Sequence, residues 1–285
     1  MQKIRNNFHF CILGILFATV ILVWYSVLKE DRAGKLTIAF FDVGQGDAIF
    51  IESPSGNQIL VDGGPDKSVL RQLGKVMPFY DRKIDALFVT NPDKDHFAGF
   101  IDVLRSYKVA AVIEPGTKGA SAEYKVFEEE IRKEGAKHII ARRGQEIALG
   151  GGAFLQILFP DRDVSGLATN DGSIVAKLIY GNTAFLLTGD APKGIENYLV
   201  DLDGKNLDVD VLKVGHHGSK TSTGDSLLGY ASPAMAVISS GKNNRYGHPN
   251  EETLARLKRF EVEIYRTDQL GTIIMESDGE NIRVK

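Results

Sequence analysis

Short runs of alternating or wholly apolar residues recur along 35–285, and longer stretches with helical periodicity separate many of them. Before Gly144, this pattern predicts strands at 35–41, 48–52, 58–61, 84–90 and 109–114, and helices at 67–77, 97–106 and 122–134. After Gly144, it predicts strands at 145–149, 154–159, 173–180, 183–188, 209–214, 234–239, 263–266, 272–276 and 282–284, and helices at 192–202, 225–230 and 251–260.

Two successive blocks, each mixing hairpins with α/β crossovers, therefore make up 36–285. Two sheets of this kind can pack face to face with helices on their outer faces, which gives a four-layer αββα sandwich of the α/β class. No stretch inside this range is long and polar enough to serve as a linker. We therefore expect a single domain at 36–285.

Residues 8–28 form a mainly apolar stretch unlike anything after it. As a helix it would be roughly 30 Å long, about the thickness of the hydrocarbon core of a bilayer. Lys3 and Arg5 precede it, so the positive-inside rule predicts a cytoplasmic segment at 1–7 and a domain outside the cell membrane. A cleaved signal peptide is the alternative, but the stretch is long for one and 25–28 offers no small-x-small cleavage site. We expect an uncleaved, single-pass membrane anchor.

Composition narrows the chemistry that the domain can carry. The 285 residues are 43% hydrophobic and 25% charged, which is typical of a globular protein. The single cysteine, Cys11, excludes a disulfide framework or a thiolate zinc cluster within one chain, so a metal ion must be held by His, Asp or Glu. The formal net charge of -3 argues against nucleic-acid binding driven by bulk charge, but it allows a local basic groove.

Asp93, Asp95 and His96 fall directly after the strand predicted at 84–90. Loops at strand ends are where α/β proteins commonly assemble a site. Carboxylates and an imidazole this close together repel, or stay partly protonated, unless a positive group joins them, and a divalent metal ion supplies that charge. The plainer alternative is a polar loop in which Asp95 caps the following helix.

Other candidate ligands share this position just after a predicted strand: Asp190, His216, His217 and His248. Loops at equivalent strand ends converge in space, so we expect these side chains to meet beside the first loop. Ordinary roles remain open to them, Asp190 as a helix N-cap and the histidines as hydrogen-bonded loop residues. A donor set of nitrogen and oxygen favours zinc or manganese over magnesium or iron.

Six motifs follow one another along the chain: DVGQGD at 42–47, LVDGG at 60–64, DKDH at 93–96, TGD at 188–190, HHGS at 216–219 and NRYGHP at 244–249. In this order they resemble the metallo-β-lactamase superfamily, and within it the extracytoplasmic hydrolase domain of the ComEC DNA-uptake proteins. The resemblance covers nearly all of 36–285. It implies an αββα fold and metal-dependent hydrolysis, with phosphodiesters as the expected substrate. We expect the single helix at 8–28 in place of the multi-span channel of those proteins.

Metal ligands are implied by the same resemblance. Asp95, His96, Asp190 and one of the two neighbours His216 and His217 would hold one ion. Asp93 would hold the other ion, with the carboxylate at 190 bridging the two.

Asn91 is the main departure from the family pattern. The signature HxDxDH of the ComEC branch begins with histidine, and this chain has asparagine there, whose amide oxygen is a much weaker ligand than imidazole. The third histidine that the family usually has in this first metal site has no counterpart either. Asn170 lies where the family's Asn-rich segment falls. We therefore expect one tightly bound zinc or manganese ion and a second ion bound weakly or only with substrate.

A bound ion would lower the pKa of a water molecule and polarise a phosphoryl oxygen. Asp95 or Asp190 would orient the attacking water, and His248 would bind a phosphate oxygen or protonate the leaving group. Substrate-binding candidates flank the same strand ends: Ser219, Lys220, Asn244 and Arg245. Supporting candidates are Asp42, Asp47, Asp62, Asn91 and Asn170. The alternative for Lys220 and Arg245 is that they are solvated residues at the rim of the site without a role in binding.

Three functions compete at this stage. The first is an anchored metal-dependent nuclease or phosphodiesterase that acts on single-stranded DNA outside the cell membrane. The second is a hydrolase of another small extracellular ester, a cyclic nucleotide or a lactam. The third is a non-catalytic module with a degenerate first metal site that binds DNA or a partner.

Overall fold

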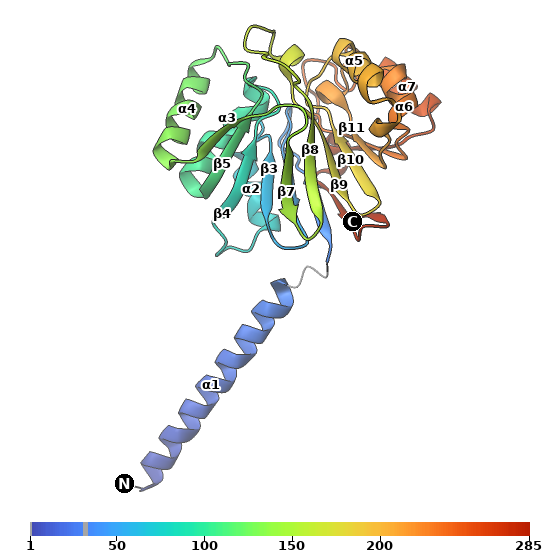
Figure 1. Ribbon diagram of the computed structural model, residues 1–285. Helices are drawn as coiled ribbons and strands as arrows, with labels where there is room; N and C mark the ends of the chain where they lie inside the picture. The colour runs from blue at the N-terminus through green and yellow to red at the C-terminus, as the bar shows by residue number, and fades with distance from the viewer. Residues whose placement is uncertain (1, 31–33) are drawn as a thin grey trace. The chain divides into compact units, whose positions relative to one another are not determined.

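The computed structural model describes the backbone of residues 2–30 and 34–285, and the side chains of 9–24 and 34–285. Met1–Gly34 and Lys35–Lys285 are two compact units, and each is described by itself (Figure 1). The second unit contains every candidate site residue.

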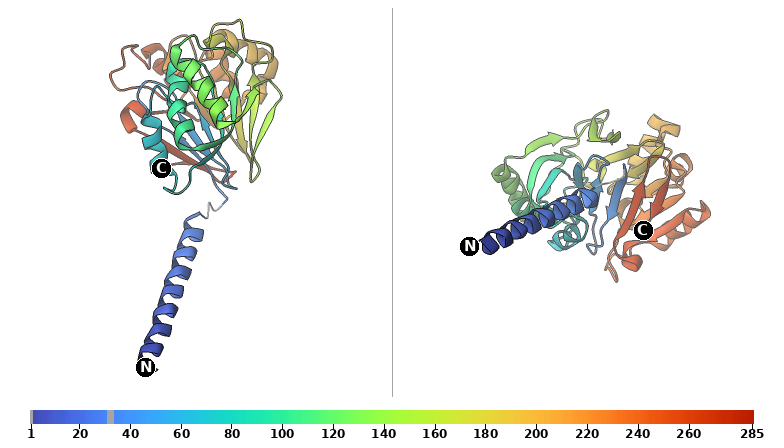
Figure 2. Two further views of the ribbon diagram at one scale, coloured as in Figure 1. Left: turned by 90° about the vertical axis from the view of Figure 1, so that its left-hand side faces the viewer. Right: turned by 90° about the horizontal axis from the view of Figure 1, so that it is seen from below.

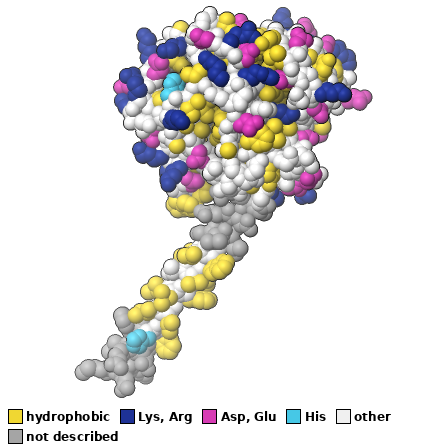
Figure 3. All heavy atoms as spheres, in the orientation of Figure 1, with side chains coloured by type: hydrophobic (Ala, Val, Ile, Leu, Met, Phe, Trp, Pro, Cys, Tyr) yellow, Lys and Arg dark blue, Asp and Glu magenta, His cyan; other side chains and the backbone are white. Residues whose placement is uncertain are grey.

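The first unit contains helix α1 (Gln2–Glu30). Its described side chains, 9–24, are exposed and mainly apolar, as the yellow atoms in Figure 3 show. The predicted membrane span covers 8–28. Its two ends, residue 8 and residues 25–28, lie outside the residues whose side chains are described. Within the described part of the chain, no helix reaches the combined length and apolarity of a membrane span. The predicted anchor is therefore not confirmed.

One sheet of the second unit has eight strands in the spatial order β15-β14-β1-β2-β3-β4-β5-β6. Its neighbours are parallel from β3 to β6 and antiparallel elsewhere. The strands are β1 (Leu36–Phe40), β2 (Ile49–Glu52), β3 (Gln58–Val61), β4 (Lys83–Phe88), β5 (Lys108–Glu114), β6 (Lys137–Ile140), β14 (Ile273–Ser277) and β15 (Ile282–Val284).

The other sheet has seven strands in the order β13-β12-β11-β10-β9-β8-β7. Its neighbours are antiparallel from β7 to β10 and parallel from β10 to β13. The strands are β7 (Glu146–Gly150), β8 (Ala153–Phe159), β9 (Val175–Tyr180), β10 (Thr183–Leu187), β11 (Val211–Lys213), β12 (Met235–Ile238) and β13 (Glu263–Arg266).

Helices cover the outer face of each sheet, and the two inner faces pack on each other (Figures 1 and 2). The first sheet carries α2 (Ser68–Val76), α3 (Lys94–Ser106) and α4 (Ala122–Glu134), and the second carries α5 (Lys193–Asp203), α6 (Asp225–Ala231) and α7 (Glu251–Arg259). Alternate residues of the strands fill the middle core, because side chains of a strand point to opposite faces of its sheet. The predicted sandwich of two sheets with flanking helices is confirmed.

Candidate metal centre

The loop after β4 and the start of α3 carry the first half of the centre. Helix α3 begins at Lys94, three residues before the predicted start, so Asp95 and His96 lie in its first turn. The His96 side chain is fully buried. Asp93 occupies the N-cap position, but its side chain makes no capping hydrogen bond, and Asp95 does not cap the helix either.

Loops from the second sheet bring the other half. Asp190 follows β10, and His216 and His217 lie in the short 3-10 segment η3 (Gly215–Gly218) after β11. Both histidines have left-handed backbone angles, φ 49° and 53°, which are uncommon for residues with a side chain. The Nε2 atom of His96 lies 3.2 Å from Asp190 Oδ2, and that of His217 lies 3.3 Å from Asp95 Oδ2. Loops of two different sheets therefore meet at one point.

Asp62, at the end of β3, fixes the ring of His96. Its Oδ2 atom lies 2.8 Å from His96 Nδ1, and the backbone N–H and hydroxyl of Thr90 donate to the same carboxylate. Because the carboxylate accepts, His96 Nδ1 must donate its proton, which leaves Nε2 as the ring nitrogen that faces Asp190. A carboxylate that holds a metal-ligating histidine in this way is common in metal sites.

His217 is oriented by a similar arrangement. Its Nδ1 atom lies 3.1 Å from the carbonyl oxygen of Ser239 and 3.3 Å from Asp47 Oδ1. The other oxygen of Asp47 accepts a 2.7 Å hydrogen bond from the ammonium group of Lys213, whose side chain is 1% exposed. Lys213 is not among the site residues predicted from the sequence. The available signal was a lysine among the apolar residues 211–214 at the end of the strand predicted at 209–214, where a charged side chain needs a partner.

The turn that carries Asp47 lies directly against the first loop. The backbone N–H of Asp47 donates to the carbonyl of Asp95. A Cβ atom at Gly46 would lie 2.3 Å from that same carbonyl oxygen, and the φ of 143° also favours glycine. Asp42, at the start of the turn, accepts a hydrogen bond from the backbone N–H of Gly44. Asp42, Asp47 and Asp62 thus contact the loops and the candidate ligand side chains.

Several buried polar atoms at this point have no hydrogen-bond partner among the described residues: His96 Nε2, His217 Nε2, Asp190 Oδ1 and His248 Nδ1. Leaving such atoms unpaired costs free energy, so a native structure normally pairs them. The ligand atoms of Asp95, His96 and His217 all lie within 4.8 Å of one another, as do those of Asp47, Asp190 and His217. Converging imidazole nitrogens and carboxylate oxygens are a donor set that suits zinc or manganese. The residues present therefore fit a divalent ion.

The charges of the cluster point to the same requirement. Burial alone would lower the pKa of His217, but the carboxylates of Asp47 and Asp190 outweigh it and raise that pKa to about 10. Burial also opposes protonation of His96, yet Asp190 and Asp62 raise its pKa well above the usual range. The neighbouring carboxylates thus draw positive charge onto both rings. A metal ion satisfies that demand while leaving both imidazoles neutral.

The two adjacent histidines differ in placement, which the sequence could not decide. The His217 side chain is 2% exposed, and its Nε2 atom lies among Asp95 and Asp190. The side chain of His216 is 27% exposed, and its Nε2 atom lies 3.7 Å from Asp190 Oδ2. His217 is therefore the inner candidate ligand, and His216 lies at the rim.

Asn91 and its neighbours are arranged differently from the cluster. The Asn91 side chain is fully buried, and its amide nitrogen donates to Asn170 Oδ1 at 2.7 Å and to Ser173 Oγ at 3.2 Å. Its amide oxygen accepts from the backbone N–H of Asp93, and Thr169 donates to the Asp93 carboxylate at 3.0 Å. Burial raises the pKa of Asp93, although the Thr169 hydroxyl favours the carboxylate. Both polar atoms of Asn91 therefore already have protein partners.

The loop after β12 brings His248 to the centre. Its ring centroid lies 5.7 Å from that of His216 and 6.5 Å from that of His217. Burial lowers the pKa of His248, and positive charge on the two neighbouring histidines lowers it further. A neutral imidazole at the edge of the cluster can accept a proton or donate its N–H to a phosphate oxygen.

The predicted substrate-binding residues fall into two groups. Ser219 is buried and exchanges a hydrogen bond with Thr221, and Asn244 uses its amide inside its own loop, so both hold backbone in place. Lys220 and Arg245 are exposed. Arg245 lines a cleft of about 500 Å³ together with Asp95, so it lies within reach of the centre.

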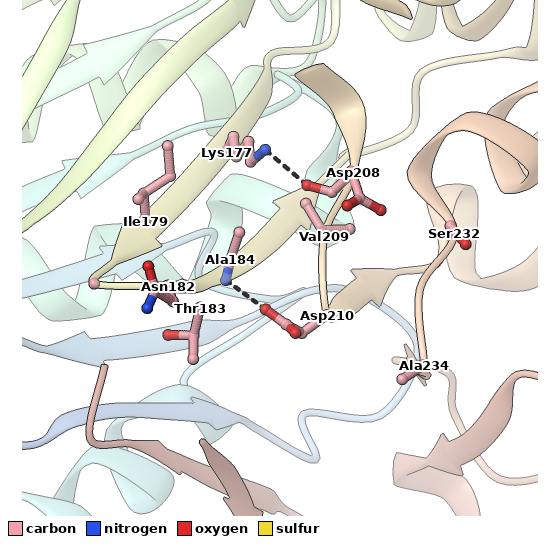
Figure 4. A pocket seen from close by; sticks show the side chains of 11 residues that line it. Lys177, Ile179, Asn182, Thr183, Ala184, Asp208, Val209, Asp210, Ser232 and Ala234 are labelled. Carbon is pink, nitrogen blue, oxygen red and sulfur yellow. Dashed lines mark hydrogen bonds between the residues drawn. The ribbon is translucent and has the colours of Figure 1, made fainter. Parts of the chain in front are cut away.

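A second hollow, of about 430 Å³, shows the contrast with the centre (Figure 4). Lys177 there donates to the carbonyl oxygens of Asn206 and Asp208, and the Asp210 carboxylate accepts from the backbone N–H of Ala184. Both charged groups are thus already paired within the protein, unlike the polar atoms of the metal centre.

Comparison with known proteins agrees with this geometry. The model of the Metallo-beta-lactamase superfamily matches residues 41–242. ComE operon protein 3 of Bacillus subtilis is 34% identical over 254 residues, which cover 83% of this chain and 32% of that protein. Recombination protein 2 of Haemophilus influenzae is 31% identical, covering 96% and 32%, and competence protein ComA of Neisseria gonorrhoeae is 30% identical, covering 84% and 32%. The chain spans about a third of the length of these curated relatives.

Solved structures support the fold alone. The metallo-beta-lactamase fold protein YhfI of Bacillus subtilis superimposes with a TM-score of 0.58 at 14% identity, covering 85% of this chain and 100% of that one. The diiron beta-hydroxylase CmlA of Streptomyces venezuelae gives 0.52 at 14% identity, covering 81% and 52%. With the family model matching most of the domain, the chain belongs to the metallo-β-lactamase superfamily, and its relatives include ComEC-like competence proteins.

Proposed function

We propose that the domain is a metal-dependent phosphodiesterase that cleaves single-stranded DNA. The observation that carries this proposal is the set of unpaired, buried ligand atoms of His96, His217 and Asp190 beside Asp95. Asp62 and Asp47 hold the two rings so that both Nε2 atoms face this set. Relatives named for competence and for recombination favour DNA over a lactam or a small ester as the substrate.

Roles follow from placement. Asp95, His96, Asp190 and His217 would hold the ion, which would supply an activated water molecule and polarise the phosphoryl group when bound. Asp95 and Asp190 offer carboxylate oxygens that can orient the attacking water. His248 lies at the rim, where its imidazole can donate to the leaving oxygen or to a phosphate oxygen.

The test is cleavage of a labelled single-stranded oligonucleotide by the full chain, with manganese, zinc and magnesium compared. We expect Asp95→Ala to abolish cleavage, because it removes a ligand and an orienting carboxylate together. His138→Ala is the matched control, since His138 lies on β6 and pairs with Glu114 instead of with the cluster. Turnover of small esters alone would favour the second function, and metal binding without any turnover would favour a binding module.

We also propose that one ion binds tightly and a second only weakly. The hydrogen bonds of Asn91 to Asn170, Ser173 and Asp93 support this, since they occupy the amide that replaces the family's histidine. Metal analysis after dialysis should give about one equivalent per chain. A value near two would contradict the proposal.

Anchoring by 8–28 remains part of the proposal. The described side chains at 9–24 are exposed and mainly apolar, and the hydroxyl of Thr19 donates to the carbonyl oxygen of Ile15, four residues back. A hydroxyl satisfied inside its own helix is compatible with a lipid environment. Membrane fractionation of the full chain against a chain without 1–30 tests the anchor, and equal partition into the soluble fraction would refute it.

A further inference from the structure

Tyr246 is an exposed aromatic side chain at the mouth of the metal centre. It is 55% exposed. Its ring stacks against that of His248, with centroids 5.9 Å apart and an interplanar angle of 23°. Together with Pro65, Arg245 and Asp95, it lines the cleft of about 500 Å³, a volume typical of small-ligand sites. A candidate metal ligand and an exposed aromatic ring therefore share one cleft.

The loop that carries Tyr246 is held in one conformation by its own hydrogen bonds. Asn244 Oδ1 accepts from the backbone N–H groups of Tyr246 and His248, and Asn244 Nδ2 donates to the carbonyl oxygens of Gly241 and His248. The ring is thus positioned before any ligand arrives. A pre-positioned aromatic side chain loses little conformational entropy on binding, which favours a role in recognition.

A cation accompanies the ring. The guanidinium group of Arg245 lies 5.0 Å from the centroid of the Tyr246 ring and donates to its hydroxyl at 2.9 Å. Arg245 makes no ion pair among the described residues, so its charge is available to a ligand. Lys94, which lines the same cleft, is paired with Glu123 at 2.6 Å. The cleft therefore offers a π surface and one unpaired positive charge.

We propose that Tyr246 is a stacking platform for one base of a single-stranded nucleic acid, with Arg245 binding a phosphate next to it. This rests on the proposed function, because it assumes that the scissile phosphate lies at the metal centre beside Asp95. Stacking on an aromatic side chain needs an unpaired base, and it tolerates every base because each has a π face. The subsite selects single strands over duplexes without reading sequence.

Charge alone does not account for retention of the strand. The formal net charge is -3, and on the face seen in Figure 3 basic and acidic side chains are interspersed instead of forming a basic track. A protein of this kind needs non-electrostatic contacts to hold a single strand, and base stacking is the contact that Tyr246 can supply.

The experiment compares two short oligothymidylates of about eight nucleotides with phosphorothioate linkages, one complete and one with abasic positions. Binding to the full chain in manganese is measured by fluorescence anisotropy. We expect the wild type to bind the complete strand about tenfold to a hundredfold more tightly than the abasic strand. Tyr246→Ala should lose this preference, and Tyr246→Phe should keep it. Tyr230→Ala, which removes a similarly exposed tyrosine on α6, is the control and should keep it as well.

The abasic strand separates stacking from a structural role. If Tyr246 only supports His248, Tyr246→Ala weakens binding of both strands by the same factor and leaves the preference unchanged, which overturns the inference. A wild type that binds neither strand also overturns it. A base preference that depends on Tyr246, in a protein that cleaves no unmodified strand, supports the stacking subsite and refutes the proposed activity. Cleavage of the unmodified strand without a base preference supports the proposed activity and refutes the stacking subsite.

Discussion

Two neighbouring positions beside the end of β4 have opposite hydrogen-bonding states. At the position of His96 and His217, the Nε2 atoms have no hydrogen-bond partner among the described residues, while Asp62 and Asp47 hold the two Nδ1 atoms. At the position of Asn91, every polar atom of the side chain has a partner. The first position is prepared for an external cation, and the second is completed by the protein itself.

The difference shows how the polar atoms of a loop can be paired within the protein instead of being left unpaired. An imidazole at 91 would present a lone pair to an ion, whereas the Asn91 amide both donates and accepts. It uses this capacity to tie the loop after β4 to Asn170 and Ser173 near β9. These hydrogen bonds join the two loops directly.

The largest expected effect comes from the inner histidine. His217→Ala should remove the tightly bound ion and reduce cleavage by more than about a hundredfold, the upper end of what loss of a supporting residue costs. His216→Ala, the matched control at the rim, should retain about one equivalent of metal. Metal analysis and single-strand cleavage measure both variants. Loss of the ion in the His216 variant alone would reverse the assignment.

Lys213→Met tests the support behind His217. The substitution removes one of two cationic side chains beside the buried Asp47 carboxylate, Lys213 and His217, and breaking a buried pair costs up to about 3–5 kcal/mol of unfolding free energy. Urea unfolding of the metal-free protein measures it. Adding Asp47→Asn should recover part of the loss, because it removes the stranded charge. A double variant less stable than Lys213→Met would show that charge is not the cause.

Asn91→His should give the position of Asn91 a metal ligand like those at His96 and His217. We expect metal content after dialysis to rise from about one equivalent toward two, with a loss of about 1–3 kcal/mol of stability because partners of the amide are left unpaired. Asn91→Ala is the matched control, since it breaks the same hydrogen bonds without adding a ligand. A second equivalent in both variants would mean that the imidazole is not the reason.

The smallest effect on the metal centre is expected at Glu196, which contacts the loop that continues from η3. Glu196 accepts from the backbone N–H groups of Thr223 and Gly224, and burial raises its pKa from 4.5 to about 7 although these amides favour the carboxylate. The folded chain therefore holds a proton that the unfolded chain releases between these pH values. Stability should fall as pH rises from 4.5 to 7, by at most about 3 kcal/mol.

Glu196→Gln should remove that fall, because the amide does not titrate in this range. Urea unfolding in chelator at pH 5 and pH 8, for both proteins, isolates the contribution of Glu196 from that of the metal centre. Parallel pH profiles for the two proteins would refute it.

Strand ends made much of the centre predictable. Periodicity located the strands before Asp95, Asp190 and His217. The parallel strands β10 and β11 direct Asp190 and His217 to one edge of their sheet, and the packing of the two sheets brings Asp95 to the same place. The predicted layers followed from the same pattern. The roles of these residues stay predictions until metal is measured.

Other features depended on contacts that sequence spacing does not reveal. His216 and His217 are adjacent, and only the left-handed turn of η3 decides which ring points inward. Lys213 pairs with a residue 166 positions away. The exposure of Tyr246 and its stacking on His248 depend on how Asn244 closes its loop. Backbone strain sets the first feature, a long-range contact sets the second, and the detailed conformation of one loop sets the third. The periodicity of apolar residues encodes none of them.

Because its ligands come from both sheets, the centre exists only where the two halves of the sandwich are docked. Asp95 and His96 belong to one sheet, and Asp190 and His217 to the other. By thermodynamic linkage, an ion at a hundred times its dissociation constant would add about 2.7 kcal/mol to the unfolding free energy. The ion would stabilise the packing of the two sheets as well as take part in catalysis. Scarcity of metal would therefore shorten the lifetime of the domain along with its activity.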